Sequence, residues 1–191
     1  MQRFQLSPLI LPTHAFQFHP NEQQVLKQSA VLIPIIEYPN YLSILFTRRS
    51  KHLTHHAGQI SFPGGKVDNQ DESILATALR EAYEEINLMP EQVTVVGQLH
   101  RYHTITGFVV TPIVGLIPAN QPLVANPNEV DEIFEVPLCH LLSTNNHRSI
   151  NMKRAQQSYA VHVYHYRHYS IWGATAGIIK ALADHLTLDL T

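Results

Sequence analysis

The sequence predicts one α/β domain. Short apolar runs at Ala30 to Ile36 and Leu42 to Phe46 are typical of strands buried on both faces. Segments at 74–86 and 171–186 instead repeat apolar residues at helical spacing. With 191 residues, the chain is long enough to bury a substantial core. Helices framing short buried strands therefore indicate the α/β class.

The N-terminal part of the chain divides into an arm and the start of the domain. Residues 1–28 are polar with scattered aromatics and prolines, which predicts an arm with a short helix near Glu22 to Lys27, ahead of a domain over residues 29–191. The two apolar runs flank Tyr38-Pro39-Asn40, which is a turn signal. We therefore expect a hairpin whose second strand carries Arg48 and Arg49 to the mouth of a site.

A Pro-Gly-Gly turn, a polar loop and a helix occupy residues 62–88. The glycines allow positive φ and let another group approach the backbone closely. Asp71 is a favourable N-cap residue, helix formers begin at Ile74, and Pro90 ends the helical pattern. The buried stripe of this helix is expected to comprise Leu75, Leu79, Ala82 and Ile86.

The middle of the chain predicts two more strands. These are Val93 to Leu99 and Val109 to Ile117, and Pro112 places the second strand at a sheet edge or at a bulge. Between them, Tyr102 to Gly107 is expected to be a loop that walls the substrate site. Asn126 to Pro137 is expected to form a loop or short turn that carries several acids.

The C-terminal region predicts a strand followed by a helix. Tyr159 to Tyr169 alternates as a strand, which places His162 and His168 on one face and His165 on the other. This geometry argues against a three-histidine zinc site. Trp172 opens the helix and is expected in the core.

Acidic side chains cluster on the helix of residues 74–86. Glu81, Glu84 and Glu85 share a face because residues three and four apart are neighbours, and each like-charge pair costs roughly 0.2–0.5 kcal/mol. A solvated acidic face is the simplest interpretation. However, Arg80 lies four residues before Glu84 and can brace a carboxylate in bidentate fashion. Because hard oxygen ligands suit Mg²⁺ or Mn²⁺, we predict a divalent metal site here.

This segment resembles the Nudix box, which begins with a Gly, has a Glu after five residues, and ends in Arg-Glu-apolar-x-Glu-Glu-x-Gly-apolar. The chain reads Arg-Glu-Ala-Tyr-Glu-Glu-Ile-Asn-Leu from Arg80. The interval from Gly65 to Arg80 is one residue longer than in the box, so either Asp71 or Glu72 stands in for the early Glu. Asn87 replaces the final Gly and is the next-best residue at a left-handed helix C-cap.

The resemblance implies a Nudix-type α/β/α sandwich, with a mixed β-sheet between helices, that works as a metal-dependent hydrolase. In Nudix folds a carboxylate from a late loop often supplies a further ligand or the general base, and Glu129 is the candidate among the acids at 129, 131, 132 and 135. The expected metal ligands are Glu81, Glu84, Glu85 and the carbonyl of Gly65. The expected catalytic residues are Arg80, Glu84, Glu85 and Glu129.

A second resemblance lies upstream, in residues 45–65. It is similar to the signature of the coenzyme A pyrophosphatase branch, in which Leu-Leu-Thr-x-Arg-Ser precedes an Arg, a Gly and Phe-Pro-Gly-Gly. The substrate-binding residues that this resemblance implies are Thr47, Arg49, Ser50, Gly58 and Phe62. Thr54 stands at the Arg position of the signature. Arg48 is left without a role, and the histidines at 52, 55 and 56 are expected to be loop residues.

The resemblance implies cleavage of coenzyme A to 3′,5′-ADP and 4′-phosphopantetheine with Mg²⁺ or Mn²⁺ as cofactor. Two alternatives stay open. One is a Nudix hydrolase that acts on ADP-ribose or a dinucleotide, and the other is a Nudix module that binds a nucleotide without turning it over. The intact Arg-Glu-x-x-Glu-Glu core argues against the pure binding module.

The composition of the chain narrows the classes of partner that it is expected to bind. A net charge of −2 and a pI near 6.7 give no broad basic surface for nucleic acid. The apolar run Leu9 to Leu11 is far too short for a signal peptide or a membrane span. Cys139 is the only cysteine, which indicates a reducing compartment, and we expect it to be buried. We therefore expect a cytoplasmic protein that binds a small nucleotide substrate, with an oligomeric state that the sequence does not set.

Overall fold

The computed structural model describes residues 26–54, 56–154 and 157–188. Most of the predicted arm, including the short helix expected near Glu22, lies outside the described residues. Lys27, which the sequence assigns to the arm, already belongs to the first strand.

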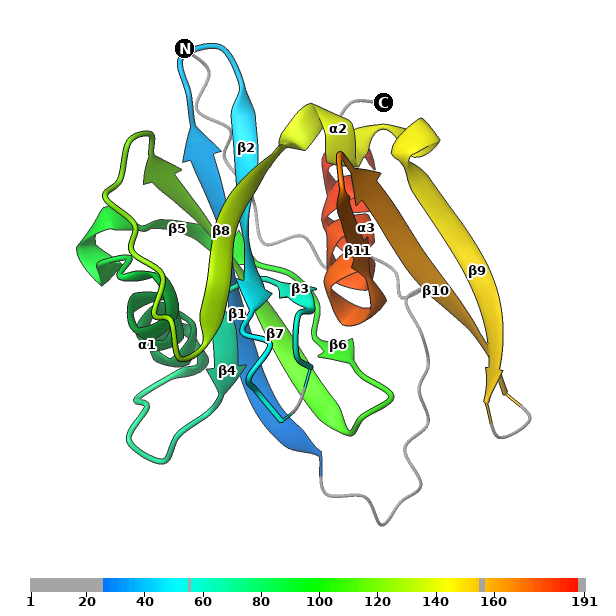
Figure 1. Ribbon diagram of the computed structural model, residues 1–191, viewed down its shortest axis with the longest axis horizontal. Coiled ribbons are helices and arrows are strands. Elements are labelled where there is room, and N and C mark those ends of the chain that lie inside the picture. Colours follow the sequence, from blue (N-terminus) through cyan, green and yellow to red (C-terminus); the bar gives the residue numbers. More distant parts are fainter. Residues whose placement is uncertain (1–25, 55, 155–156, 189–191) are drawn as a thin grey trace.

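A mixed β-sheet forms the centre of the molecule (Figure 1). β1 (Lys27–Glu37) and β2 (Leu42–Arg49) form the predicted antiparallel hairpin, and β1 also pairs in parallel along its whole length with β7 (Phe108–Pro118). β5 (Thr94–Gln98) and β6 (Tyr102–His103) add antiparallel to the far side of β7, while β8 (Val130–Pro137) adds antiparallel to β2. Within the described residues the sheet has eight strands: β1 (Lys27–Glu37), β2 (Leu42–Arg49), β3 (Ile60–Ser61), β4 (Gly64–Lys66), β5 (Thr94–Gln98), β6 (Tyr102–His103), β7 (Phe108–Pro118) and β8 (Val130–Pro137).

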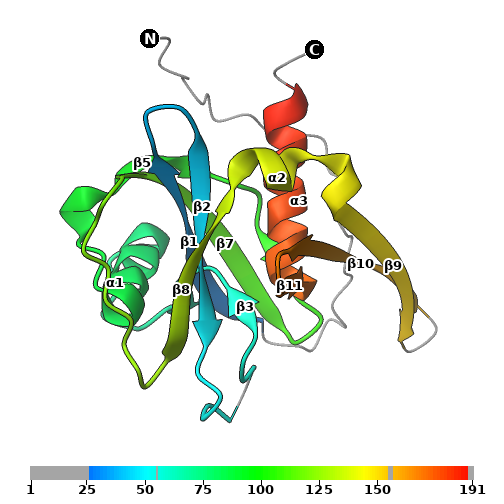
Figure 2. The ribbon, with the colours of Figure 1, turned by 45° about the horizontal axis from the view of Figure 1, so that its top comes forward.

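The sheet lies between two layers. Helix α1 (Ile74–Ile86) covers one face, and the opposite side carries α2 (Leu138–Leu142), α3 (Gly173–Leu188) and a small antiparallel sheet (Figures 1 and 2). The strands of the small sheet are β9 (His147–Arg154), β10 (Gln157–Tyr166) and β11 (Tyr169–Trp172). Short 3-10 turns occupy Pro90–Gln92 and Thr144–Asn146. The predicted α/β class with a mixed sheet between helices is confirmed.

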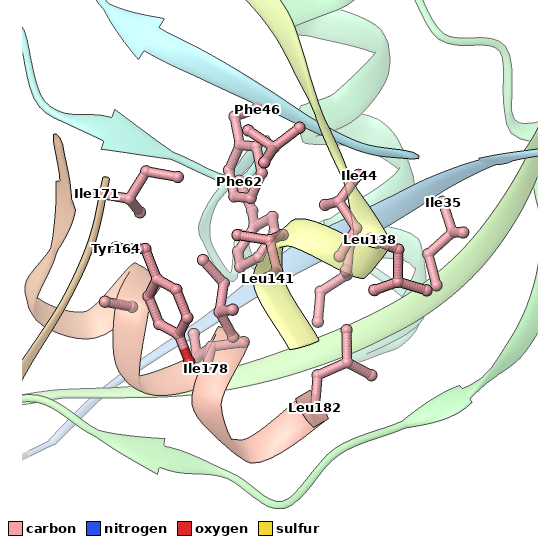
Figure 3. Close-up of a cluster of buried hydrophobic side chains, with 14 of the residues drawn as sticks. Ile35, Ile44, Phe46, Phe62, Leu138, Leu141, Tyr164, Ile171, Ile178 and Leu182 are labelled. Carbon is pink, nitrogen blue, oxygen red and sulfur yellow. The ribbon is translucent and has the colours of Figure 1, made fainter. Parts of the chain in front are cut away.

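Two hydrophobic clusters hold these layers together. Consecutive residues of β1 point to opposite faces, so Leu32 packs with Ala78 and Ile86 of α1 while Ile33 packs in the cluster under α3. Phe46, Phe62, Tyr164, Ile178 and Leu182 belong to the second cluster, which joins the sheet to α3 (Figure 3). The prediction that β1 and β2 are buried on both faces is therefore confirmed.

β7 is not an edge strand, so the first of the two alternatives predicted from Pro112 is wrong, whereas the pairing of β7 with β5 does shift register between Val95 and Gly97. β7 lies between β1 and β5. Pro112 occupies the point where the outer partner changes, since β5 pairs as far as Ile113 and β6 begins opposite Val110. Its carbonyl still accepts a hydrogen bond from the Leu99 backbone N–H at 2.9 Å. The missing proline N–H is thus accommodated at a break between strands, and Tyr102 opens β6 rather than a loop.

Most of the segment from Asn126 to Pro137 is a strand, so the predicted loop is wrong. Val130, Phe134 and Val136 are buried at alternate positions of β8 against β2. Buried apolar residues alternate with other residues along this segment, which is the pattern of a half-buried strand, and the acids make that alternation hard to recognise.

The C-terminal strand prediction is too long. β10 ends at Tyr166, and Arg167 takes a left-handed φ of 53° that turns the chain into β11. His168 therefore lies in a hairpin turn and not on the face of His162. Trp172 ends β11 with 51% of its surface exposed, so its predicted place in the core is wrong. The helix then begins at Gly173 and buries Ile178, Ile179 and Leu182 as predicted.

Two further surface features follow. Cys139 lies on the short helix α2, for which no helix was predicted, and its side chain is exposed, so the predicted burial is wrong. Among the described residues, no helix is both long enough and apolar enough to cross a membrane.

A histidine pair joins β9 to β10 beneath α3. His147 Nε2 and His162 Nδ1 are 2.8 Å apart, and their rings lie 4.9 Å apart. Burial lowers the pKa of both rings, and the charge of Lys180 on α3 adds to this while Asp184 opposes it. The charge of His147 also lowers the pKa of His162.

This pair predicts loss of stability in mild acid. Unfolded histidines titrate near pH 6.5. Because both folded pKa values lie lower, the unfolded chain binds more protons as the pH falls from about 6.5, and the free energy of unfolding decreases. We expect the Tm of His162→Gln to rise relative to that of the wild type as the pH falls from 7.5 to 5.5. His165→Gln, at an exposed position on the same strand, should keep the wild-type slope, and equal slopes for all three proteins would contradict this account.

Candidate active site

The Phe-Pro-Gly-Gly turn sets the backbone of the site against β1. Phe62 is buried, and the Pro63 carbonyl accepts a hydrogen bond from the Leu32 backbone N–H at 2.9 Å. A Cβ on Gly64 would collide with the backbone of β1, and a Cβ on Gly65 would overlap the carboxylate of Glu81. The Glu81 carboxylate therefore lies directly against the Gly65 backbone, where only glycine leaves room for it.

Helix α1 begins and ends with caps. Ser73 is the N-cap, and its hydroxyl accepts a hydrogen bond from the Ala76 backbone N–H at 3.1 Å. Asn87 adopts the predicted left-handed C-cap, with φ 55°. The predicted N-cap role of Asp71 is wrong, because its carboxylate is engaged with Arg80 and Thr77 instead.

Arg80 links the loop, β4 and the acids of α1. Its Nε and Nη2 donate to the two Asp71 oxygens at 2.8 and 3.0 Å, and Nη2 also reaches the Lys66 carbonyl at 3.3 Å. Nη1 donates to Glu81 and Glu84, at 3.0 Å each. The hydrogen bond from Arg80 holds the pKa of Asp71 well below its ordinary value. The bidentate pair fixes the guanidinium plane, which in turn orients both glutamates.

This pairing also separates Asp71 from Glu72, the two candidates for the early acid of the box. Glu72 is exposed, whereas Asp71 makes the contacts with Arg80. Asp71 is thus a positioning residue for the helix acids.

Glu85 is the most deeply buried acid of the helix. Its side chain is 2% exposed, and Arg49 Nη1 lies 3.5 Å from its Oε1. The other oxygen, Oε2, is enclosed and has no hydrogen-bond partner among the described residues. Burial raises the pKa of Glu85 to about 8, the charge of Arg49 opposes the rise, and the charges of Glu81 and Glu129 add to it. An unpaired buried carboxylate oxygen is costly unless a cation or a proton satisfies it.

Glu129 approaches the same place from another part of the chain. Its backbone N–H donates to the Asn126 carbonyl at 3.0 Å, and its own carbonyl accepts from the Ser50 backbone N–H at 2.8 Å. The Asn126 backbone N–H in turn donates to the Glu85 carbonyl at 2.9 Å. This turn, tied to the end of α1 and the end of β2, brings the charge of Glu129 close enough to raise the pKa values of Glu81 and Glu85.

The helix acids do not share one solvent-facing side. Glu81 is largely buried, and burial raises its pKa while the hydrogen bond from Arg80 opposes the rise. Glu84 is exposed and Glu85 is buried among the core residues of the helix. The buried stripe includes Ala78, Ala82, Glu85 and Ile86, whereas Leu75 and Leu79 are only half-buried. The stripe is rotated from its predicted position, which turns the acids toward β4 and the Glu129 turn.

A family model described as the NUDIX domain matches residues 26–155. The chain belongs to the Nudix family. An uncharacterized Nudix hydrolase, NudL, of Escherichia fergusonii is 46% identical over 157 residues, which cover 82% of this chain and 81% of that protein. The protein of the same description from Salmonella paratyphi B is 45% identical with the same coverage.

Solved structures share the Nudix fold. A MutT/nudix family protein from Enterococcus faecalis superposes with a TM-score of 0.54 and 18% identity, covering 87% of this chain and 64% of that one. A Caenorhabditis elegans Ap4A hydrolase, solved as a binary complex, gives a TM-score of 0.51 and 20% identity, covering 59% of this chain and 81% of that one. At these identities the likeness shows the fold alone. With its family established, the chain is a Nudix hydrolase, of a class that acts on nucleoside diphosphate derivatives and generally needs divalent metal ions.

The residues of this Nudix site fit a divalent cation. Glu85 offers an unpartnered buried oxygen, and Glu81 lies in the cradle against Gly65. Carboxylate and carbonyl oxygens are the hard ligands that such ions prefer. Within residues 26–54, 56–154 and 157–188, no three His, Cys, Asp or Glu side chains are already arranged as a ligand set. Arg80 instead neutralises Glu81 and Glu84 by ion pairs of 3.0 Å.

The residues of the upstream signature separate into buried and accessible groups. Thr47 and Ser50 are fully buried, with the Thr47 hydroxyl 3.3 Å from Ser61 and the Ser50 hydroxyl accepting from the His52 N–H at 3.4 Å. Phe62 stacks on Phe46 in the core. These three residues therefore support the loop from within. Arg49, Gly58 and Thr54 reach the surface, together with His52 and His56, while His55 lies outside the described residues.

Arg48, to which the sequence assigns no role, is bound on the other face of β2. Its Nη2 pairs with Glu132 at 2.8 Å, and the Tyr169 hydroxyl donates to the same glutamate at 2.7 Å. This network could not be predicted from the sequence because its members come from three distant strands. The alternation of β8, once seen, would have placed Glu132 on the buried face beside Phe134.

Proposed function

We propose that this Nudix hydrolase is a coenzyme A pyrophosphatase that uses Mg²⁺ or Mn²⁺ and releases 3′,5′-ADP and 4′-phosphopantetheine. The observation that carries the proposal is the enclosed Glu85 oxygen beside Arg49, which has no hydrogen-bond partner among the described residues and which a divalent cation would satisfy. The choice of coenzyme A is supported by the signature residues from Thr47 to Gly65.

Glu81, Glu84, Glu85 and the Gly65 carbonyl would hold the cation. When bound, a divalent cation neutralises the diphosphate and lowers the pKa of an attacking water. Asp71 and Lys66 fix Arg80, and Arg80 fixes the direction of Glu81 and Glu84. The site is thus oriented by hydrogen bonds before substrate arrives.

Two further side chains act on the substrate. Glu129, on a turn fixed by its backbone, acts as general base for the water or as a further ligand. Arg49 contacts Glu85 at the long distance of 3.5 Å and keeps part of its guanidinium exposed. It therefore has donors left to bind a substrate phosphate.

A second candidate substrate class is ADP-ribose or a dinucleotide. Thr54 favours it, because this exposed position carries a neutral hydroxyl where the coenzyme A signature has Arg. The test is a comparison of kcat/KM for coenzyme A, ADP-ribose and diadenosine polyphosphates with Mg²⁺, with products identified by mass spectrometry. Coenzyme A as the preferred substrate supports the proposal. Preference for another diphosphate would refute the assignment to coenzyme A but would be consistent with a hydrolase. If none of the three substrates is turned over, the protein is a binding module.

Thr54→Arg is expected to raise kcat/KM for coenzyme A by roughly 10- to 100-fold. A charge-assisted hydrogen bond to phosphate contributes roughly 1.5–3 kcal/mol, and about 1.4 kcal/mol corresponds to tenfold. If the contact is to the 3′-phosphate, dephospho-coenzyme A should gain less. Thr144→Arg adds the same charge at an exposed position elsewhere and serves as the control. If the wild type prefers ADP-ribose and Thr54→Arg leaves kcat/KM for both substrates unchanged, the coenzyme A assignment is refuted.

A further inference from the structure

A cavity of about 380 Å³ lies between the upstream signature loop and the C-terminal hairpin. Arg48 and Arg49 are consecutive on β2, so their side chains point to opposite faces, with Arg49 toward Glu85 and Arg48 toward this cavity. The cavity is lined by Arg48, Ala57, Gly58, Gln59, Ile60, His168, Tyr169, Ser170 and Trp172.

Backbone hydrogen bonds join the cavity wall to Arg49 of the acidic site. The Gly58 backbone N–H donates to the Arg49 carbonyl at 3.1 Å, and the Arg49 backbone N–H donates to the Gln59 carbonyl at 2.9 Å. One wall of the cavity is therefore hydrogen-bonded to the residue whose guanidinium contacts Glu85. A substrate with its diphosphate at the acidic site would reach the cavity around the end of β2.

The opposite wall is held rigidly. The Thr175 hydroxyl donates to the Ile60 carbonyl at 3.0 Å, which ties the first turn of α3 to β3. Tyr169 stacks on Phe134 with ring centroids 3.7 Å apart. Walls that are fixed before binding reduce the entropy lost when a ligand is ordered.

The chemistry of the lining fits a planar heteroaromatic ring. Trp172 is 51% exposed at the end of β11, and the rings of His168 and Tyr169, which also line the cavity, lie 3.9 Å apart at a tilt of 38°. Glu132 holds the guanidinium of Arg48 by a 2.8 Å ion pair, and a fixed guanidinium also stacks on flat rings. Only Ala57 and Ile60 offer aliphatic surface, so the lining suits a nucleobase better than a flexible pantetheine arm.

We propose that this cavity binds the nucleoside end of the substrate and that Trp172 is the specificity-determining residue on which the base stacks. The inference rests on the proposed function, which supplies a substrate with a nucleoside. Cavities for small ligands span roughly 300–1,000 Å³, so this one suits a nucleoside and leaves the rest of the substrate outside.

Trp172 is the only tryptophan in the chain, so tryptophan fluorescence, excited selectively over the eight tyrosines, reports on the cavity. The wild-type protein with Mg²⁺ is titrated with 3′,5′-ADP, with AMP and with 4′-phosphopantetheine, which are products or fragments and are not turned over. We expect saturable quenching by the two adenine nucleotides and none by 4′-phosphopantetheine. Quenching by 4′-phosphopantetheine alone, or no saturable change with any of the three, would overturn the proposal.

Trp172→Ala should lower kcat/KM for coenzyme A by roughly 5- to 150-fold, mostly through KM, because stacking on an aromatic side chain contributes about 1–3 kcal/mol per base. Trp172→Phe should recover most of the loss. Tyr41→Ala, which removes a ring that is 52% exposed elsewhere, is the control. Wild-type kinetics in Trp172→Ala would overturn the inference and leave the proposed function intact. Quenching by adenine nucleotides without hydrolysis of coenzyme A would support the cavity and refute the proposed function.

Discussion

Glu85→Gln is expected to lower kcat/KM by about 100-fold or more and, in the presence of a chelator, to raise Tm. Charge stabilisation by a catalytic cation contributes several kcal/mol, and each ~1.4 kcal/mol corresponds to tenfold. The Tm effect follows from the raised pKa of about 8 for the Glu85 carboxyl. Because that pKa lies above the unfolded value, the contribution of this carboxyl to stability is fully present below about pH 4.5 and is lost as the pH rises toward 8. Neutral Gln removes this penalty, so the Tm gain should be larger at pH 8 than at pH 5.

Two variants separate the metal role from a general loss of charge. Glu84→Gln should also lose most activity, but without the Tm gain, because Glu84 is 47% exposed. Glu135→Gln removes an acid that accepts from the Tyr38 hydroxyl at 3.1 Å, and it should keep wild-type turnover. Near wild-type turnover of both Glu84→Gln and Glu85→Gln at saturating Mg²⁺ would show that the metal assignment is wrong.

Glu129→Gln is expected to lower kcat by about 10²–10⁴-fold, with a much smaller rise in KM, since loss of a general base costs that much. The turn that carries Glu129 is held by backbone hydrogen bonds to Asn126 and Ser50, which the substitution leaves intact. The variant should therefore keep the wild-type Tm, and steady-state kinetics over a range of pH measures the effect.

Asp131→Asn is the matched control for Glu129. Asp131 lies two residues along the chain and accepts from the Lys51 backbone N–H at 3.3 Å. Glu132 is committed to Arg48 and Tyr169. A change confined to KM in Glu129→Gln would reassign the residue to substrate binding, and an unchanged enzyme would exclude it from the mechanism.

The helix and hairpin could be predicted because their patterns are local. The apolar runs of β1 and β2 flank a turn signal, and Asn87 is a residue that tolerates the left-handed cap. The N-cap prediction is wrong by two residues because Asp71 and Ser73 are both good caps. Only the tertiary contact with Arg80 decides between them.

The burial of the helix acids could not be predicted from their spacing along the sequence. Helical periodicity places Glu85 near Ala82 and Ile86, but hydrophobicity assigns a glutamate to the solvent side. The observed burial comes from β4 and the Glu129 turn, which approach the helix from distant parts of the chain. Functional acids are where a local rule is expected to fail.

The prediction that Trp172 lies in the core is wrong for a related reason. A large aromatic residue next to the start of a helix is expected in the core. However, β11 alternates buried and exposed residues, and Trp172 ends the strand on its exposed face. Its surroundings come from residues 57–60 and from Arg48, which no local pattern connects to it.

The central claim is that the acids beside Gly65 bind a divalent cation. The most direct measurement is a calorimetric titration of Mn²⁺ into the wild-type protein, Glu85→Gln and Glu135→Gln, followed by competition with Mg²⁺. We expect the wild type and Glu135→Gln to bind Mn²⁺ with equal affinity and Mg²⁺ to displace it. Glu85→Gln should bind at least tenfold more weakly, since weakening the support of a ligand alone costs about 10- to 100-fold. Equal Mn²⁺ affinity for all three proteins would contradict the claim.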